Sequence, residues 1–183
     1  MILNYNDFRS QIKNGDVLLY DSVGWINRYI IKPLLKTKYS HAGSAVWWND
    51  RLMVMEAVPA GIRLMPLSVN VENYYGSVDL YRWSEQISDK KRKSMIIHAQ
   101  EQLGKPYAKR EAFKFGLKLL FKEKLDTRDA INKASTMFCS WFIADEYNFI
   151  GLDVKKNVAD AYIHPDDFIE KFQNIGTLKI FKE

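Results

Sequence analysis

Short stretches of mostly apolar residues, bounded by turn-forming residues, predict several β-strands in this sequence. Runs of this kind are typical of strands with one or both faces buried. They cover residues 16–20, 41–48, 51–58, 62–67, 77–83 and 177–181. The turn pair Asn49-Asp50 separates the second run from the third, which predicts a β-hairpin.

Apolar residues at helical spacing predict helices in most of the remaining chain. Residues 1–14 fit a short helix or turn that leads to the turn signal Asn14-Gly15. Further predicted helices cover residues 23–38, 87–103, 108–125 and 138–150, and a short one starts at His164-Pro165. Thr136 is a candidate cap for the helix at 138–150, and Gly151 a candidate stop. Strands mostly precede helices along the chain, which predicts an α+β fold with an antiparallel sheet.

Two of the predicted helices combine apolar residues with many lysines and arginines. These segments, 23–38 and 108–125, favour contact with an anionic membrane surface, where cations meet headgroups and apolar side chains insert. Packing of the apolar side on the protein's own core, with the lysines in water, explains the same pattern equally well. The pattern alone leaves both interpretations open.

The size and composition of the chain indicate one globular domain spanning residues 1–183. The 183 residues are 47% hydrophobic and 27% charged, which is typical of a folded protein with a real core. The apolar stretches are too short to cross a bilayer. A basic segment followed by an apolar segment is missing at the start, so no secretory signal is visible and we expect a cytoplasmic protein, with peripheral membrane association as an option.

Charge and cysteine content narrow the range of partners and cofactors. A net charge of +5 favours anionic partners, although solubility alone explains such an excess as well. Nucleic acid is a poor candidate, because the basic residues alternate with aliphatic rather than base-stacking side chains in the longest basic segment. The single cysteine excludes an intramolecular disulfide, and three scattered histidines predict no metal site. We expect no cofactor.

Three residues are candidates for nucleophilic catalysis. Cys139 falls in the first turn of a predicted helix, where the helix dipole favours the thiolate, although a single buried cysteine is commonly inert. His41 stands at the entry of a predicted strand and could exchange a proton with a thiol, or could be a structural histidine. Glu56 lies in an otherwise apolar strand of the same hairpin, where it could orient an imidazole or could face solvent.

The order of five short motifs resembles a known family. The motifs are Gly15-Asp16-Val17-Leu18-Leu19-Tyr20, Ser40-His41-Ala42-Gly43, Glu56-Ala57, Gly104-Lys105-Pro106-Tyr107 and Phe138-Cys139-Ser140. In this order they resemble the circularly permuted branch of the NlpC/P60 papain-like superfamily, which includes YiiX-like proteins and, more distantly, lecithin–retinol acyltransferase-like enzymes. The histidine precedes the cysteine in this branch. The resemblance covers residues from about 15 to about 170.

The resemblance implies a papain-like fold in which a small antiparallel sheet packs against helices. It implies Cys139 as nucleophile, His41 as base and Glu56 as third member of the triad. It also makes Tyr20 and Tyr107 candidates for substrate binding, and the backbone N–H of Cys139 a candidate donor to the oxyanion. The stretch at about 108–135 is longer than the family pattern and is interpreted as a basic amphipathic helical insertion.

Three functions agree with these residues. The first is cysteine-dependent hydrolysis of an amide, in a cell-wall peptide or an N-acyl amino acid, through a thioester. The second is transfer or hydrolysis of a lipid acyl group at a membrane surface. The third is binding without catalysis on the same fold. The sequence leaves the oligomeric state undetermined.

Overall fold

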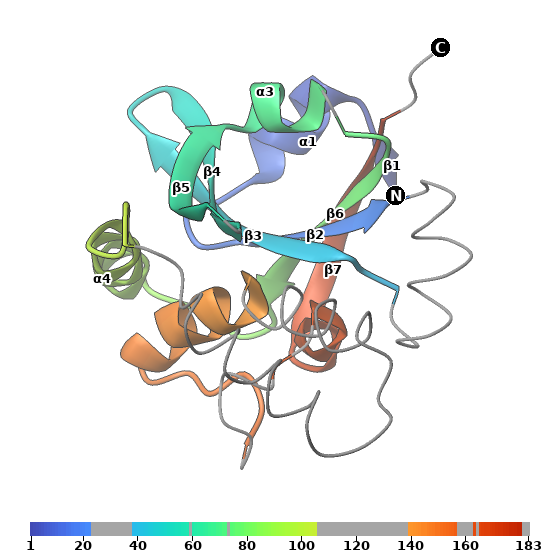
Figure 1. Ribbon diagram of the computed structural model, residues 1–183. Helices are drawn as coiled ribbons and strands as arrows, with labels where there is room; N and C mark the ends of the chain where they lie inside the picture. Colours follow the sequence, from blue (N-terminus) through green and yellow to red (C-terminus); the bar gives the residue numbers. More distant parts are fainter. Residues whose placement is uncertain are drawn as a thin grey trace, which may run out of the picture.

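The computed structural model describes residues 1–22, 38–58, 60–72, 74–105, 139–156, 163 and 165–180. Within these residues, seven strands pair in a single sheet in the order β1-β7-β6-β2-β3-β4-β5 (Figure 1). Neighbouring strands run antiparallel, except that β1 and β7 are parallel. The predicted α+β class with an antiparallel sheet is therefore confirmed.

The elements of the described chain are mostly short. The strands are β1 (Ile2–Leu3), β2 (Val17–Ser22), β3 (His41–Trp48), β4 (Arg51–Val58), β5 (Gly61–Pro66), β6 (Gly76–Trp83) and β7 (Phe172–Ile180). The α-helices are α1 (Tyr5–Gln11), α3 (Leu67–Glu72), α4 (Asp89–Gln100) and one over residues 139–149, and η3 (Pro165–Glu170) is a 3-10 helix.

Most of the elements that the sequence predicts are present. The β3–β4 hairpin forms as expected, and Asn49 in its turn has a φ of 51°. The prediction of a last strand at 177–181 was too short, because β7 begins at Phe172. Within β7, Leu3 of β1 packs over Gly176, and a Cβ at that glycine would lie 2.5 Å from Leu3 Cδ1.

Other predicted elements differ from the observed ones at their boundaries or lie outside the described residues. The strand expected at 62–67 ends at Pro66, and Leu67 begins α3, a short helix that the sequence pattern did not predict. Apart from Lys38, the segments 23–38 and 108–125 lie outside the described residues, as do Thr136 and His164.

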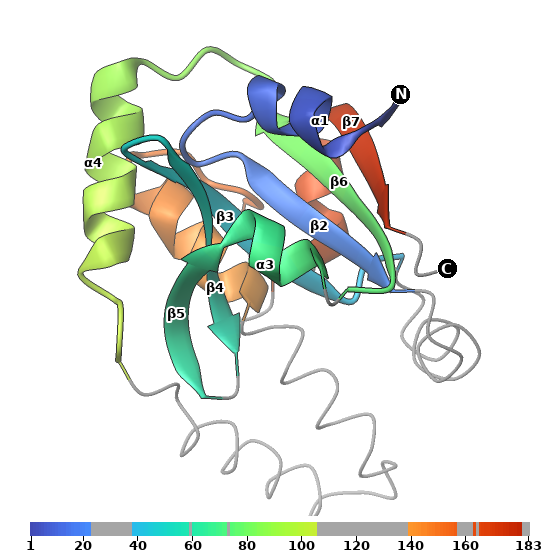
Figure 2. The same ribbon diagram turned by 90° about the horizontal axis from the view of Figure 1, so that it is seen from above.

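Two apolar clusters fill the two faces of the sheet. Successive residues of β2 point to opposite faces, so Val17 and Leu19 join one cluster while Leu18 and Tyr20 join the other. The first cluster includes side chains of α4, η3 and the helix at 139–149, and the second includes those of α1 and α3. Figure 2 shows α1 and α3 in front of the strands and the helix at 139–149, in orange, behind them. Burial on both faces explains the unbroken apolar run of β2.

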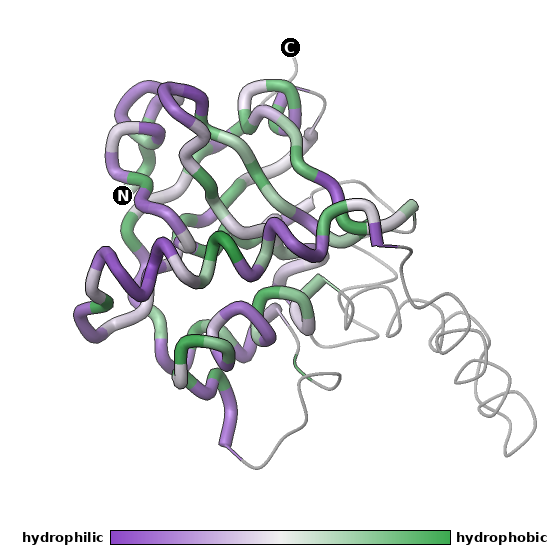
Figure 3. Tube along the Cα trace, turned by 90° about the vertical axis from the view of Figure 1, so that its left-hand side faces the viewer, coloured by the Kyte–Doolittle hydropathy of each residue, from purple (hydrophilic) through white to green (hydrophobic). Residues whose placement is uncertain are grey.

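Hydropathy along the chain follows this layering. The strands in the middle of the molecule are mostly apolar, whereas α4, which faces the viewer in Figure 3, mixes polar and apolar turns. Its Met95, Ile96 and Ala99 are buried and its lysines are exposed. The helix at 139–149 packs on the same face of the sheet, which brings Cys139 close to the beginning of β3.

Candidate active site

Cys139 is buried in the apolar cluster between the sheet and the helices. It is the first described residue of the helix at 139–149, and its side chain has no exposed surface. The described part of this helix confirms the predicted helix at 138–150, and Gly151, with a φ of 80°, follows its end as expected. Cys139 forms a side-chain hydrogen bond with His41, so the two residues that the sequence singled out are adjacent.

His41 is the first residue of β3, and its side chain is 26% exposed. Its Nε2 donates a hydrogen bond of 2.6 Å to Oε2 of Glu56 on β4. Because Nε2 is occupied in this way, Nδ1 is the ring nitrogen that is left to exchange a proton with the thiol of Cys139. The imidazole thus lies between a sulfur and a carboxylate, which is the arrangement of a nucleophile–base–orienter triad.

Glu56 is 2% exposed and does not face solvent, contrary to the alternative that its sequence allowed. Its second oxygen, Oε1, accepts hydrogen bonds from Nε and Nη2 of Arg63, at 2.9 and 2.7 Å, and from Nδ2 of Asn70 at 3.1 Å. Burial pushes the pKa of Glu56 upward, but the hydrogen bonds and charges of His41 and Arg63 outweigh it and lower the pKa. Glu56 is therefore an anion with both oxygens engaged.

The pKa of His41 is raised to about 10 by its two neighbours. Burial alone would lower it, but the negative charge of Cys139 and the hydrogen bond with that residue outweigh burial, with Glu56 adding to the effect. The protonated imidazole is therefore the favoured form of His41 at neutral pH, with the sulfur of Cys139 as its hydrogen-bond partner.

Arg63 and Asn70 were not found by sequence reasoning. Arg63 lies directly opposite Glu56 in the β4–β5 pairing, so a prediction of register would have placed these opposite charges together. Asn70 belongs to α3, and the sequence carried no signal for that helix. Both residues fix the carboxylate that in turn fixes His41.

Tyr20 lies behind His41 rather than on an open surface. It is 2% exposed, its ring centroid is 5.3 Å from that of His41, and its hydroxyl donates to Oδ1 of Asn70 at 2.8 Å. These contacts are those of a residue that positions the imidazole and Asn70. The other candidate for substrate binding, Tyr107, lies outside the described residues.

Gly43 explains how Glu56 reaches His41. Side chains at 41 and 43 share one face of β3, and a Cβ added at Gly43 would lie 2.6 Å from Cγ2 of Val54 and 3.7 Å from Cβ of Glu56. The missing side chain leaves room for β4 side chains to lie across β3. The Ser40-His41-Ala42-Gly43 motif therefore contains a steric requirement as well as the base.

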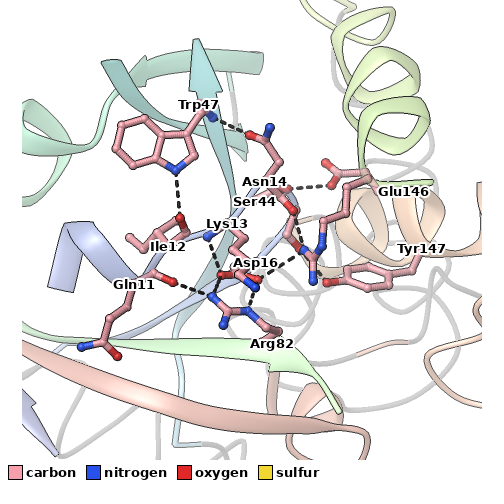
Figure 4. A network of polar contacts seen from close by, with 12 residues as sticks. Gln11, Ile12, Lys13, Asn14, Asp16, Ser44, Trp47, Arg82, Glu146 and Tyr147 are labelled. Carbon is pink, nitrogen blue, oxygen red and sulfur yellow. Dashed lines mark hydrogen bonds and ion pairs between the residues drawn. The ribbon is translucent and has the colours of Figure 1, made fainter. Parts of the chain in front are cut away.

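Gly15 and Asp16 form a structural centre away from the triad (Figure 4). Asp16 is fully buried and accepts hydrogen bonds from Nε and Nη2 of Arg82, at 2.9 and 2.6 Å, with Arg92 of α4 at 3.5 Å. Tyr147, from the helix at 139–149, donates to the carbonyl of Gly15 at 2.6 Å. This centre connects β2, β6, α4 and the helix that carries Cys139.

His98 is not part of the triad. His98 of α4 stacks on Phe149 with centroids 4.1 Å apart and bonds to Asp145 at 2.8 Å, so it joins α4 to the helix at 139–149. His164 lies outside the described residues. Among the described residues, no group of three or more His, Cys, Asp or Glu side chains could hold a metal ion. In the same part of the chain, no helix is long and apolar enough to cross a membrane.

The chain is similar to known proteins both in sequence and in fold. A family model described as permuted papain-like amidase enzyme, YaeF/YiiX, C92 family, matches residues 11–177. The crystal structure of the metalloprotein YiiX from Escherichia coli O157:H7 has a similar fold, with a TM-score of 0.62 and 19% sequence identity. The likeness covers 90% of this chain and 97% of the YiiX chain. No curated protein sequence matches significantly. The predicted permuted papain-like fold is confirmed.

Proposed function

Because the chain belongs to the permuted papain-like amidase family YaeF/YiiX, C92, we propose that it hydrolyses an amide through a thioester formed on Cys139. His41 is the acid and base of this reaction, and Glu56 orients the imidazole. The observation that supports these roles is the position of His41, bonded to Cys139 on one side and, at 2.6 Å, to Glu56 on the other. Family membership supports the choice of an amide as substrate.

The first half of the reaction uses the charged pair. The Cys139 thiolate attacks the carbonyl carbon, the imidazolium of His41 gives its proton to the leaving nitrogen, and the C–N bond breaks. An amine leaves and the acyl group stays on sulfur. The backbone N–H of Cys139 as an oxyanion donor stays a prediction, because the preceding segment lies outside the described residues.

The second half requires His41 to act as a base, and acylation itself prepares it for this role. The thioester carries no charge, so the attraction of Cys139, which is the first of the effects that raise the pKa of His41, disappears when the acyl group is attached. The imidazole then accepts a proton from water, which attacks the thioester and releases the acid. Glu56 still holds Nε2, so the ring keeps its orientation.

The proposed mechanism uses no metal ion. YiiX, the similar structure, is described as a metalloprotein, but the triad of this chain does not fit a metal site. Oε1 of Glu56 accepts from Arg63 and Asn70 and Oε2 accepts from His41, so the charge of this carboxylate is already compensated by three side chains. His41 is likewise occupied at Nε2.

We propose a chemical class of substrate for the acyl donor. We favour a peptide of the cell wall or an N-acyl amino acid, because the family is one of amidases. A lipid acyl ester is the second candidate, favoured by the basic and apolar composition of residues 23–38 and 108–125. Matched amides and esters of one acyl group separate the two, since an amidase turns over both and a lipid esterase only the ester.

Substitution of the triad tests the proposed function directly. Cys139→Ala and His41→Ala should each reduce turnover of an N-acyl amino acid anilide or of p-nitrophenyl acetate to the background rate, with thermal unfolding unchanged. His98→Ala is the matched control and should keep its turnover, because His98 bonds only outside the triad. Turnover retained in both triad variants would contradict these roles, whereas a wild type that does not turn over any amide or ester would leave binding without catalysis on the same fold as the explanation.

The single cysteine gives a second test that needs no substrate. Iodoacetamide can alkylate only Cys139, and intact mass reports its extent. A thiolate paired with His41 should react at neutral pH, whereas an ordinary thiol reacts mainly above about pH 8. Slow alkylation that rises only at alkaline pH contradicts the charged pair.

A further inference from the structure

Glu146 is a fully buried carboxyl group that the proposed mechanism does not use. It lies on the helix at 139–149, two turns after Cys139, and its side chain has no exposed surface. Its Oε2 accepts a hydrogen bond of 2.7 Å from the hydroxyl of Ser44, which is also fully buried. Its Oε1 has no hydrogen-bond partner among the described residues.

The position of this bond relates it to the triad. Ser44 is on β3, three residues after His41, and its side chain points to the face of the sheet on which the helix packs. The bond from Ser44 to Glu146 therefore joins the strand that carries the base to the helix that carries the nucleophile (Figure 4). It runs parallel to the contact between Cys139 and His41, further along the same two elements.

We propose that Glu146, in its neutral form, is a positioning residue that holds the Cys139 helix against the His41 strand through Ser44. This inference rests on the proposed function, because the two elements matter to the reaction through their catalytic residues. A carboxylate at this position would bury a full charge with a single donor, which is strongly unfavourable, whereas a neutral carboxyl buries only a dipole. Loss of the Glu146 proton should therefore weaken the packing of the helix on β3, because the cost of the buried charge exceeds the gain from a stronger hydrogen bond with Ser44.

The charges around Glu146 support the neutral form. Burial raises the pKa of Glu146 to about 8, the hydrogen bond from Ser44 opposes this, and the adjacent Asp145 adds to it. Asp145 bonds to His98 of α4. The nearby arginines, Arg82 of β6 and Arg92 of α4, bond to Asp16, and among the described residues no cation bonds to Glu146.

The sign of the effect on stability follows from these values. In the unfolded chain Glu146 ionises near its ordinary pKa of 4.5, whereas in the fold it keeps its proton to about pH 8. The folded chain thus binds more protons between these values, so its stability declines as pH rises from 4.5 to about 8. Above that pH Glu146 carries a negative charge in a buried position, so the helix at 139–149 should separate more often from β3.

The experiment compares the wild type with Glu146→Gln, which has the same shape but no charge to gain, and with Glu101→Gln, an exposed control. Amide hydrogen exchange of the helix at 139–149 and turnover of p-nitrophenyl acetate are measured one pH unit below and above the Glu146 pKa. In the wild type and in Glu101→Gln, protection of the helix and kcat should fall about tenfold across this interval, with KM unchanged. In Glu146→Gln both should stay level.

A second variant and two independent measurements distinguish failure of the positioning role from failure of the proposed function. Ser44→Ala should lower kcat at neutral pH as well, because it removes the tie in every protonation state. The same pH dependence of exchange in the wild type and in Glu146→Gln would overturn the positioning role. Turnover retained in Cys139→Ala would overturn the proposed function instead, since hydrogen exchange does not depend on catalysis.

Discussion

At the scale of single residues, the proposed reaction depends on the charge state of His41. Its neighbours on both sides are acidic groups, and the protonated ring is favoured up to about pH 10. A histidine with a raised pKa stabilises the fold fully below its ordinary value of 6.5, and this contribution is lost as pH rises through about 10. The same group therefore links reactivity and stability to pH.

Removal of the thiol should lower the pKa of His41. The charge of Cys139 is the first of the effects that raise it, so Cys139→Ala should move the titration of the His41 ring from about pH 10 toward neutrality. NMR of the imidazole ring carbons measures this, with His41→Ala to assign the signal. Glu56→Gln is the comparison and should cause a smaller downward shift. A midpoint that stays near 10 in Cys139→Ala contradicts the assigned pair.

Arg63 should matter through Glu56 rather than through the substrate. Arg63→Gln removes the two hydrogen bonds to Oε1 and leaves that oxygen with Asn70 only, so the pKa of Glu56 should rise and its hold on His41 should loosen. Loss of a bond to a charged group is worth about 1.5–3 kcal/mol, so we expect a fall in kcat of roughly tenfold or more. Steady-state kinetics with KM unchanged would support this, and Arg63→Lys should restore only part of the rate.

At the scale of elements, Gly43 sets the distance between β3 and β4. The Cβ of Gly43→Ala would lie 2.6 Å from Cγ2 of Val54, so the Val54 side chain or one of the two strands must shift, and we expect the bond from His41 to Glu56 to lengthen. We expect a loss of about 1–3 kcal/mol in the free energy of unfolding, as for other overpacked positions, together with lower turnover. Urea unfolding and kinetics measure both.

A compensating substitution tests whether the clash is the cause. Val54→Ala removes Cγ2, so the double variant Gly43→Ala/Val54→Ala should recover turnover relative to Gly43→Ala alone. Turnover that stays low in the double variant would place the effect elsewhere.

We expect Asp16 to hold β2, β6, α4 and the helix at 139–149 together. Asp16→Asn leaves Arg82 and Arg92 without their shared anion in a mostly buried position. Breaking a buried ion pair by removing one partner is worth about 3–5 kcal/mol, and chemical denaturation should show a loss of that order. The exposed Asp50→Asn is the control and should change stability little. A similarly small loss for Asp16→Asn would contradict the role of this centre.

The elements also explain what the sequence could and could not predict. Strong local patterns identified β3, β4, β6 and α4, and the order of motifs identified Cys139, His41 and Glu56 as a group that the fold brings together. Arg63 follows from strand register, which depends on pairing between segments rather than on either segment alone. Asn70 and Glu146 carry no local signal, because their roles arise from tertiary packing.

At the scale of the whole molecule, the positive charge is unevenly distributed along the chain. The basic segments 23–38 and 108–125 contain 10 Lys and Arg and 2 Asp and Glu, a net charge of +8, whereas the full sequence carries +5. The rest of the chain is therefore net −3. The first segment ends shortly before His41 in sequence, and the second precedes Cys139.

This distribution predicts where an anionic surface would bind. Attraction to anionic lipid is worth about 1 kcal/mol per Lys or Arg near the surface and is screened by salt. Wild-type protein should therefore sediment with phosphatidylserine-containing vesicles at low salt and be released at high salt. Sedimentation should be abolished in the triple variant Lys114→Glu/Lys118→Glu/Lys122→Glu. The control is the same change at three exposed lysines in and after α4, Lys90, Lys93 and Lys105, and it should keep sedimentation. Equal loss in both variants would indicate that overall charge, rather than the two basic segments, governs binding. No sedimentation of the wild type at low salt would remove the case for a lipid acyl donor.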